Sequence, residues 1–343
     1  MDKILAIGDL HFRPSLGYSE YVKDQRIPER QEILDFIVKQ SEDCSIVVFL
    51  GDQFHVKNPM AETTRDFTAF LERLGNKQIH LLVGNHEVRA NGASALDYLK
   101  EIKGKKWHIV NGIEKVDDMV FCSYQNKLFL ETEDNKSGQD KLLKLLPSGR
   151  VLFTHQAVSD TLTNSGTNTD IFDEIILPKE LLEKRYELSV SGHIHKASVS
   201  SSGKTIVAGS IFNQEIGEIE KCIWKVNPHD LSYEKIKLPG RPIYKFEDPK
   251  LEDLKSLPTN SIVKIILTEK LSEEKLAEIN NLADNFDALI VVEHIKRERN
   301  SNYNEETNLL DLSMESLLEV YAKQNNLDVG KLKQGFDLVK DTI

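Results

Sequence analysis

Cysteine is scarce in this 343-residue chain, and long apolar runs are missing. The three thiols, Cys44, Cys122 and Cys222, are widely spaced and form no CxxC pair, so the sequence indicates neither a disulfide framework nor a cysteine-based zinc site. We therefore expect them to be reduced and structural. No run of about 18 apolar residues could cross a bilayer, and no apolar leader follows Met1. We expect a cytoplasmic protein with no membrane partner.

An excess of basic residues is also lacking, because 44 Lys and Arg stand against 55 Asp and Glu, for a net charge of -11. Phosphate affinity comes from clustered Lys and Arg, so this balance argues against a protein that coats nucleic acid with its whole surface. It does not exclude a nuclease, because bound metal ions supply positive charge locally. The length suggests two or three domains, and an apolar content of 40% is ordinary for a soluble globular protein.

What the chain does contain is a series of apolar runs that end in residues of metal-binding types. They are residues 3–8 before Asp9 and His11, 45–51 before Asp52, 81–84 before Asn85, His86 and Glu87, 151–154 before His155, and 188–192 before His193 and His195. Each run indicates a buried strand, and open α/β sheets place their ligands at the carboxyl ends of strands. Taken singly, each motif is typical of a turn. Five in order predict a shared site.

The residue types indicate which ions this site would hold. Carboxylate, imidazole and amide groups suit Mn²⁺, Fe²⁺ or Zn²⁺ better than Ca²⁺, which takes oxygen ligands almost alone. The seven candidate ligands are Asp9, His11, Asp52, Asn85, His155, His193 and His195. Seven ligands predict two divalent ions, whose charge would let an acidic protein bind a phosphodiester.

Helical patterns alternate with the first strands. They cover residues 28–40, where Pro28 opens the helix, residues 61–74 and residues 94–102. This alternation of strands and helices predicts a parallel sheet covered by helices on both faces. Further strands are predicted at 107–110, 119–123, 205–208 and 221–226. Beyond a boundary near 239–242, the predicted elements are a β-α-β unit at 261–267, 272–284 and 288–294, a charged linker at 296–307, and amphipathic helices at 314–322 and 329–339.

The ordered motifs resemble those of the calcineurin-like metallophosphoesterases. The matching residues are Asp9-x-His11, Gly51-Asp52, Gly84-Asn85-His86-Glu87, His155 and Gly192-His193-x-His195. Gly51-Asp52-Gln53-Phe54-His55, Asn58-Pro59, Thr154-His155-Gln156 and Ala208-Gly209-Ser210 further resemble the SbcD nuclease and its relatives, the meiotic-recombination nucleases and the recombination nuclease of T-even phages. The resemblance is strong over residues 1–240 and covers the remainder only in layout. The compact chain with its short tail is closer to the phage and bacterial branch of these nucleases, which implies the bacterial cytosol and a bacterial or phage source. The resemblance implies an α/β fold, a two-sheet metallophosphoesterase sandwich flanked by helices, with a small α/β cap domain and C-terminal helices.

The resemblance also assigns roles to individual residues. It implies one metal ion held by Asp9, His11, Asp52 and His195, and a second held by Asp52, Asn85, His155 and His193, with Asp52 shared. Mn²⁺ is the expected metal, with Mg²⁺, Fe²⁺ and Zn²⁺ as alternatives. His86 would be the catalytic residue that protonates the leaving oxygen or stabilises the phosphorane. His55, Arg13 and Arg26 are the expected substrate contacts, together with Arg30, and Glu87 stands where the family most often has Asp. For His55 a purely structural role is the alternative, and Arg30 is equally typical of an exposed helix face.

The implied domains are a dinuclear-metal nuclease domain at 1–240, a cap that aligns DNA at 241–300, and at 301–343 a linker with helices that bind an SbcC-type ABC ATPase. A homodimer is also implied, with Phe67, Phe70, Leu71 and Leu74 as its seam. The alternative is that these four residues pack on their own sheet. For the terminal helices, the alternative is a hairpin folded back on the cap.

The resulting prediction is a metal-dependent DNA nuclease subunit, acting as a 3′-to-5′ exonuclease on duplex DNA and an endonuclease on single strands during break processing and recombination. The residues alone indicate only phosphoester hydrolysis. One alternative is a phosphodiesterase or phosphatase of a small substrate. Another is a catalytically silent scaffold, which the presence of all seven ligands and His86 disfavours.

Overall fold

A computed structural model describes residues 3–13, 23–89, 91–163, 166–213, 220–247, 250–258, 261–267 and 290–294, and the single positions 277, 278, 281 and 329. Its contacts divide the chain into two compact units, residues 1–294 and 295–343. The predicted linker and terminal helices lie outside the described residues except for position 329. They remain predictions, as do the domain boundaries at 240 and 300.

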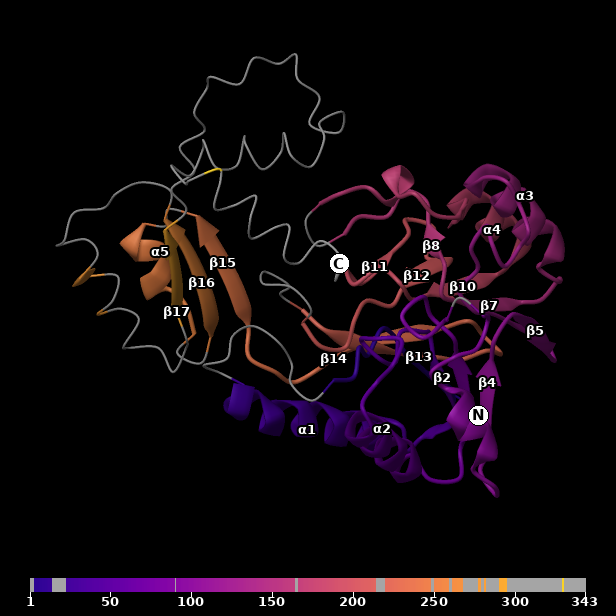
Figure 1. The fold of residues 1–343 in the computed structure, drawn as a ribbon, viewed down its shortest axis with the longest axis horizontal. Helices are drawn as coiled ribbons and strands as arrows, with labels where there is room; N and C mark the ends of the chain where they lie inside the picture. Colours follow the sequence, from indigo (N-terminus) through magenta and orange to yellow (C-terminus); the bar gives the residue numbers. More distant parts are fainter. Residues whose placement is uncertain are drawn as a thin grey trace, which may run out of the picture. The chain divides into compact units, whose positions relative to one another are not determined.

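Two six-stranded sheets form the main body of the first unit (Figure 1). The order in the first sheet is β14 (Tyr233–Lys237), β13 (Cys222–Val226), β1 (Lys3–Ile7), β2 (Cys44–Phe49), β3 (Gln78–Leu82) and β4 (Trp107–Val110). Strands β1 to β4 are parallel, and β13 and β14 extend the sheet in antiparallel pairing. The parallel β-α-β prediction is therefore confirmed for the N-terminal half.

The second sheet has the order β11 (Ser198–Val199), β12 (Thr205–Val207), β10 (Leu188–Ser191), β7 (Val151–Thr154), β6 (Met119–Cys122) and β5 (Ile113–Val116). Its four central strands are parallel, and the two edge strands are antiparallel. A smaller pair joins β8 (Ala157–Val158) to β9 (Ile176–Leu177). Strands β5, β11 and β14 were not predicted, since their half-exposed residues form no continuous apolar run.

The alternation of side chains along the strands builds the core on both faces of each sheet. Ile4 and Ala6 of β1 pack in a cluster that includes Phe153 of β7, which lies between the two sheets. Their neighbours Leu5 and Ile7 belong to a second cluster on the helical side of the first sheet. Every residue of this strand after Lys3 is thus buried, which explains its continuous apolar sequence. The predicted two-sheet sandwich is confirmed.

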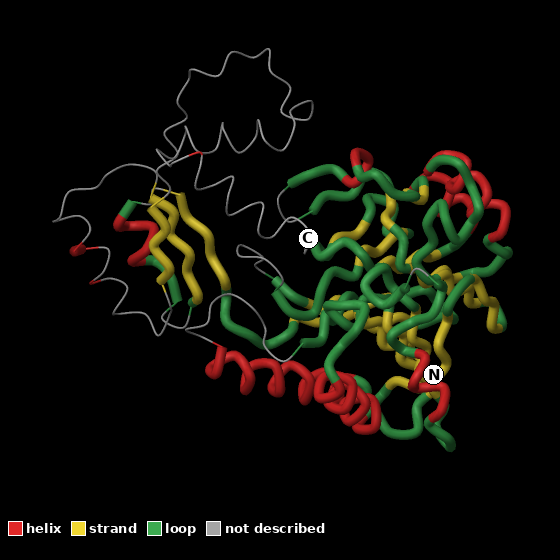
Figure 2. Tube along the Cα trace, in the orientation of Figure 1, coloured by secondary structure: helices red, strands yellow, loops and turns green. Residues whose placement is uncertain are grey.

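Helices cover the outer faces of the sandwich, as the red segments of Figure 2 show. On the first sheet lie α1 (Lys23–Gln40) and α2 (Ala61–Arg73), and on the second lie α3 (Asn135–Leu145) and α4 (Lys179–Arg185). Short 3₁₀ turns follow at Asp97–Glu101 and Thr169–Ile171. An Asp134–Ser137 capping box opens α3. The described residues include no helix long and apolar enough to cross a membrane.

Two predicted helix boundaries were wrong. Helix α1 begins at Lys23 rather than Pro28, so the proline lies inside the helix. Its fixed φ fits a helix, and its missing N–H costs one backbone hydrogen bond. The predicted helix at 94–102 is only a 3₁₀ turn from Asp97 to Glu101. Ser94 is drawn instead into a bridge with Val88, and its N–H is bound by Asp97 at 2.7 Å.

The proposed dimer seam was also assigned to the wrong residues. Phe67, Phe70, Leu71 and Leu74 are at most 2% exposed and pack in the core beneath the first sheet. The ring of Phe67 contacts those of Phe49 and Phe54 at centroid distances of 6.1 and 5.1 Å. An amphipathic pattern shows that a face is covered but not by what. A homodimer remains a prediction, and it would require other residues.

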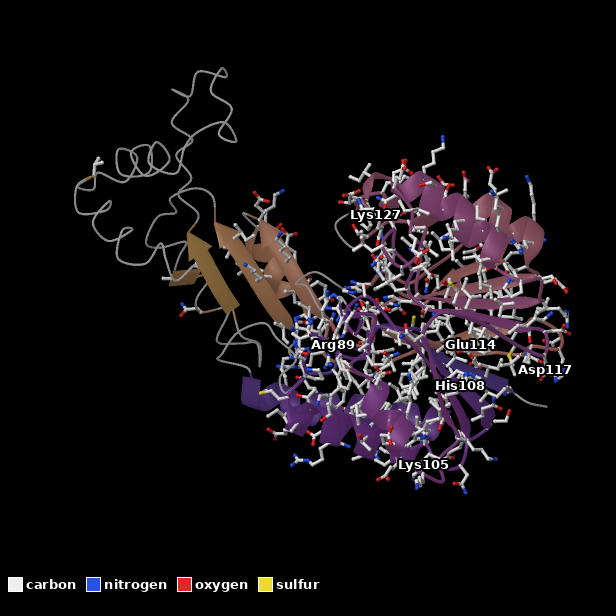
Figure 3. The ribbon with its side chains drawn as sticks, turned by 45° about the vertical axis from the view of Figure 1, so that its right-hand side comes forward. Arg89, Lys105, His108, Glu114, Asp117 and Lys127 are labelled. Atoms are coloured by element: carbon white, nitrogen blue, oxygen red, sulfur yellow. The ribbon has the colours of Figure 1, made fainter. Side chains whose placement is uncertain are left out.

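The two sheets are also tied at one pair of edges. Nε2 of His108 on β4 lies 2.5 Å from a carboxylate oxygen of Glu114 on β5. Figure 3 shows the two side chains next to one another at the surface. Between these strands the chain turns at Gly112, whose φ of +138° favours glycine. The contact therefore fixes the point at which the chain passes from one sheet to the other.

A separate three-stranded parallel sheet follows the sandwich in sequence. It has the order β15 (Ile243–Glu247), β16 (Ile262–Leu267) and β17 (Ile290–His294), with α5 (Leu251–Lys255) between the first two strands. The strands predicted at 261–267 and 288–294 are confirmed. The helix predicted at 272–284 lies outside the described residues except at positions 277, 278 and 281.

Candidate metal centre

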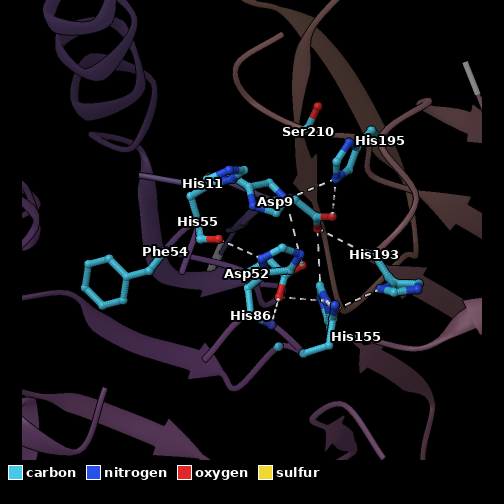
Figure 4. A network of polar contacts seen from close by, with 12 residues as sticks. Asp9, His11, Asp52, Phe54, His55, His86, His155, His193, His195 and Ser210 are labelled. Atoms are coloured by element: carbon cyan, nitrogen blue, oxygen red, sulfur yellow. Dashed lines mark hydrogen bonds and ion pairs between the residues drawn. The ribbon is translucent and has the colours of Figure 1, made fainter. Parts of the chain in front are cut away.

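The loops that follow β1, β2, β3, β7 and β10 meet at one end of the sandwich (Figure 4). Because parallel strands point the same way, their carboxyl ends lie at one edge. Backbone bonds lock the loops together, since the N–H groups of Leu10 and His11 both donate to the carbonyl of Asp52 at 3.1 and 2.8 Å. All seven predicted metal ligands lie at this edge.

Three of these ligands form a first group. The ligand atoms of Asp9, His11 and His195 all lie within 4.8 Å of one another. Nε2 of His11 is 3.0 Å from Nε2 of His195, which in turn is 3.6 Å from Oδ2 of Asp9. That carboxylate oxygen is buried and has no hydrogen-bond partner among the residues that the structure describes. A buried oxygen of this kind facing two imidazole nitrogens suits a divalent ion.

Asp52, His155 and His193 form a second group with the same spacing. Oδ1 of Asn85 lies 3.1 Å from a nitrogen of each of these histidines, so the amide oxygen faces the same point. Oδ1 of Asp52 is 3.3 Å from His155, and its Oδ2 is 3.8 Å from His11. Asp52 thus lies between the two groups, which is the shared position that the sequence predicted.

Hydrogen bonds to the ring nitrogens that face away from the metal groups fix the orientation of two histidines. Nδ1 of His155 donates to the carbonyl of Leu50 at 2.6 Å, which leaves Nε2 toward Asp52. On His193, Nε2 meets a carboxylate oxygen of Glu174 at 2.8 Å, which leaves Nδ1 toward Asn85. A carboxylate or carbonyl on the far nitrogen is the usual support for a metal-binding histidine, since it fixes the tautomer and the ring orientation.

The backbone closes tightly around the carboxylates. The N–H of His193 donates to Asp9, and that of His86 donates to Asp52, each at 2.9 Å. A Cβ added at Gly84 would lie 2.1 Å from Oδ1 of Asp52, so only glycine fits there. His11, Asp52 and His193 have φ values of 44°, 49° and 73°. Such left-handed conformations are costly outside glycine and often mark functional sites.

Burial and charge set the protonation of the ligands. Burial lowers the pKa of His11 well below its usual value, and burial together with Lys221 lowers that of His195 to about 3. Burial also opposes protonation of His155, but Asp52 and Asp9 outweigh it and raise its pKa to about 10. Burial raises the pKa of Asp9 to about 6. The site is therefore rich in neutral imidazole, and His155 must lose a proton before it can bind an ion.

Glu87 is a structural residue of the centre. It is fully buried, and its two oxygens accept the N–H groups of Phe54 and Gly84 at 2.7 and 2.8 Å. Burial, reinforced by the nearby Asp52 charge, raises its pKa to about 8. No described contact joins Glu87 to the His86 ring. Its carboxyl group instead ties the loop after β2 to the loop after β3.

His86 stands at the open side of the centre, with 37% of its side chain exposed. Its Nδ1 donates to the carbonyl of His55 at 2.8 Å, so Nε2 is left facing Oδ2 of Asp52 at 3.9 Å. The ring packs edge-on against His11 at a centroid distance of 4.7 Å. His86 belongs to neither of the two groups above, and its role as a catalytic residue remains a prediction.

The predicted substrate contacts fall into two sets. Nε2 of His55 lies 3.2 Å from Nη1 of Arg13, and the His55 ring stacks on His86. With His11 and His86, His55 makes a third group of close nitrogens, but one without the carboxylate that the other two have. Arg26 does not suit substrate binding, since it is 3% exposed and pairs with Glu29.

Arg30 braces the structure as well. It donates to the carbonyl of Arg13 at 2.8 Å and lies 5.0 Å from the centre of the Phe12 ring. Its guanidinium is also 3.7 Å from Asp66 of α2. These contacts hold the end of the loop that carries Arg13. They favour a supporting role over the phosphate contact that the sequence suggested.

Several contributors were missed from the sequence. Glu174, which supports His193, lies in a loop with no recognisable motif. Lys221 donates to Ser210 at 2.6 Å and brings positive charge near His195. Gln156 binds the backbone of Gln125 in both directions and also the carbonyl of Ile175. Tyr124 lies 5.8 Å from the His193 ring, and it follows the apolar run of β6. The strand-end rule pointed to this place, but not to a tyrosine.

A two-sheet sandwich whose strand ends gather two carboxylates, one amide and four imidazoles defines a metallophosphoesterase. Residues 2–197 match the family described as calcineurin-like phosphoesterase, and the chain belongs to this family. It is therefore a metal-dependent phosphoesterase, a hydrolase whose candidate ligand groups are those described above. The two groups are candidates for the two ion sites that the resemblance implies, and the assignment of ligands to each ion remains a prediction.

The other comparisons give no finer identity. One similar solved structure is described as a novel archaeal phosphodiesterase, at 14% sequence identity and a TM-score of 0.35, covering 69% of this chain and 99% of that one. At this level of similarity it does not define a substrate. No significant match to a curated protein was found.

Proposed function

We propose that this phosphoesterase is a DNA nuclease that hydrolyses phosphodiesters during double-strand-break processing and recombination. Its activities would be 3′-to-5′ exonuclease on duplex DNA and endonuclease on single strands. The observation that carries the proposal is the position of His86, outside both metal groups and half-exposed beside them. A side chain at the rim of a two-metal centre is placed to protonate the leaving oxygen of a phosphodiester, which adds to the stabilisation that the ions supply.

The residues of the chain divide the work. Bound divalent ions, with Mn²⁺ as the proposed metal, would supply Lewis-acid stabilisation of phosphate charge and activation of water. The chain holds them through Asp9, His11 and His195, and through Asp52, Asn85, His155 and His193. His86, with Nδ1 committed to the His55 carbonyl, presents Nε2 to the substrate side. A proton on Nε2 would pass to the leaving 3′ oxygen.

Three features support DNA rather than a small ester. Arg13 and His55 place cationic and polar groups next to His86. The motifs from Gly51 to His55 and at Ala208-Gly209-Ser210 resemble those of the SbcD nucleases. A small parallel sheet, β15 to β17, follows the sandwich at the place of the cap that aligns DNA in that family. A simple esterase would need none of these additions.

The proposed partners follow from the same resemblance. An SbcC-type ABC ATPase would bind the helices predicted at 314–322 and 329–339, whose apolar faces suit a groove on a partner. Charged substitutions at Leu317 and Leu318 should then abolish co-purification with such an ATPase. Retained binding by this double variant would contradict the assignment. Sedimentation of the wild type tests the proposed homodimer.

The nuclease is tested with an end-labelled duplex in the presence of Mn²⁺. We expect the wild type to degrade it, and both His86→Ala and His193→Ala to lose activity. His86→Ala should lower the rate by about 10²- to 10⁴-fold while retaining bound metal. His193→Ala should lose metal as well, which can be measured by elemental analysis. A metal-loaded wild type that hydrolyses an aryl phosphodiester but not DNA, with or without the ATPase, would favour the small-substrate phosphodiesterase.

A further inference from the structure

A pocket opens beside the metal centre. It has a volume of about 310 Å³ and is lined by Lys57, Asn85, His86, Val88, Tyr124 and Asn126. One end is the centre itself, because Asn85 faces His155 and His193, and His86 faces Asp52. A phosphodiester bound at the metal groups would therefore have one of its two substituents next to this pocket.

One wall of the pocket is the ring of Tyr124. The ring is held in place, since the backbone N–H of Tyr124 donates to the carbonyl of Val83 at 2.9 Å and the ring lies 5.8 Å from His193. The loop that carries it is further fixed where Gln125 and Gln156 bond to one another in both directions. A held aromatic ring offers a flat surface on which a nucleobase stacks without sequence preference.

The polar lining suits a polyanion. None of the six lining residues is acidic, although the chain as a whole has a net charge of -11. Lys57 is exposed, and no carboxylate in the described part of the chain pairs with it. Oδ1 of Asn126 accepts the N–H groups of Leu128 and Phe129 at 3.0 Å each, so its amide N–H₂ group is the side available for donation.

We propose that this pocket binds one nucleoside unit of the substrate strand, with the base against Tyr124 and the adjoining phosphate near Lys57. The inference rests on the phosphodiesterase function proposed above and adds what the enzyme recognises next to the bond that it breaks. A volume of about 310 Å³ is at the low end for ligand pockets, which suits a single nucleoside. The enzyme should therefore prefer nucleotide esters to simple diesters that offer the same leaving group.

The test uses chromogenic esters that differ only in the group on the retained side. Thymidine 5′-(p-nitrophenyl phosphate) and its 3′-linked isomer carry a base, and methyl p-nitrophenyl phosphate does not. Base–aromatic stacking corresponds to about a 5- to 150-fold change in equilibrium constant, so one of the two thymidine esters should exceed the methyl ester in kcat/KM by a factor in this range. Tyr124→Ala should remove most of that ratio, and Tyr124→Phe should keep it because the ring remains.

A matched control is Leu128→Ala. Leu128 lies on the same loop, is 78% exposed and does not line the pocket, so both the rates and their ratio should equal those of the wild type. Equal kcat/KM on all three esters would overturn the nucleoside pocket but leave the phosphodiesterase standing. A ratio that survives in a folded Tyr124→Ala variant would overturn the role of the ring. Failure to hydrolyse any ester or DNA in Mn²⁺ would overturn both proposals.

Discussion

The two sides of the catalytic centre are built differently. On the inner side, Asp9, Asp52 and His155 are at most 2% exposed, and backbone N–H or carbonyl groups fix each of them. On the outer side, His86 and Tyr124 are partly exposed. Each is held by a hydrogen bond to a backbone carbonyl and by ring packing, but neither is enclosed as the inner residues are. The buried residues can therefore bind a metal ion in the absence of substrate, and the partly exposed residues can contact a substrate without being metal ligands. Substitutions should therefore separate metal binding from substrate recognition.

The largest effect is expected at the buried side. In His155→Ala, the second metal group loses a ligand, and Asp9 and Asp52 lose the positive charge between them. Metal stoichiometry should fall from two to one, and phosphodiester hydrolysis should fall to background. Elemental analysis and turnover of an aryl phosphodiester measure the two quantities. His108→Ala, a histidine with 49% of its side chain exposed and far from the ligand groups in sequence and contact, should change neither. Two bound ions with normal turnover in His155→Ala would show that the buried residues do not form the metal-binding side of the centre.

The second effect is a pH dependence that belongs to the buried side alone. The pKa of His155 is raised to about 10 without metal, so the histidine is protonated at neutral pH and must release that proton when an ion binds. Affinity for the second ion should therefore rise with pH, by about tenfold per unit between pH 7 and 9. Calorimetry in buffers of different ionisation enthalpy would detect the release of about one proton. The same affinity at pH 7 and pH 9 would contradict the assignment.

A smaller effect on metal affinity is expected at Glu174, which supports the metal ligand His193 from its far side. Glu174→Gln keeps the shape of the side chain but weakens the 2.8 Å contact to His193. Loss of such a support typically lowers metal affinity by about 10- to 100-fold. Titration with Mn²⁺, followed by the paramagnetic signal of the free ion, measures the change. Glu180→Gln on the exposed face of α4 is the matched control. If both variants bind Mn²⁺ as the wild type does, Glu174 does not orient His193.

The last effect lies away from the centre, in the packing between the sheets, and concerns stability rather than metal binding. His80 of β3 is 1% exposed, stacks on Phe121 at 4.3 Å, and has its pKa lowered to about 4 by burial and by His108. Because the folded state binds the proton less readily than the unfolded chain, stability is full above about pH 6.5. It should fall by about 1.4 kcal/mol per pH unit on acidification toward pH 4.

His80→Phe keeps a ring on Phe121 and removes the titrating group. In urea unfolding of metal-free protein, its stability should vary less between pH 7 and pH 5 than that of the wild type. Identical pH dependence in the two proteins would show that acid acts at the catalytic centre rather than in the sheet packing.

The position of the site could be predicted from the sequence because parallel strands end at the same edge of a sheet. Apolar runs ending in Asp, Asn or His gave strands whose carboxyl ends meet, and the candidate ligands from Asp9 to His195 lie together at that edge. Sequence reasoning failed where the partner of a side chain lies far away in the chain. The apolar face of α2 revealed burial but not that its own sheet buries it. Nor could Arg26 show from its position that Glu29 holds it.

Glu174 illustrates the remaining limit. It lies 19 residues before His193, in a loop whose position depends on the bond from Gln156 to the carbonyl of Ile175. No local pattern records such a bond, since either residue alone is typical of many loops. The supporting contacts of a centre depend on tertiary structure, whereas its ligands follow the strand ends that the sequence does reveal.

Gln156 links the loop of the proposed nucleoside pocket to the loop that supports the metal centre. The same side chain holds the loop of Tyr124 through Gln125 and the loop of Glu174 through Ile175. Because both loops are bonded to this side chain, fixing the conformation of one should help to fix the other. A nucleotide bound against Tyr124 should therefore raise the affinity for an ion at His193, and the ion should raise the affinity for the nucleotide. Thermodynamic linkage makes such coupling reciprocal: whatever factor a bound nucleotide adds to the affinity for the ion, the ion adds to the affinity for the nucleotide. This chain would then hold its second metal most firmly while it is engaged with its substrate.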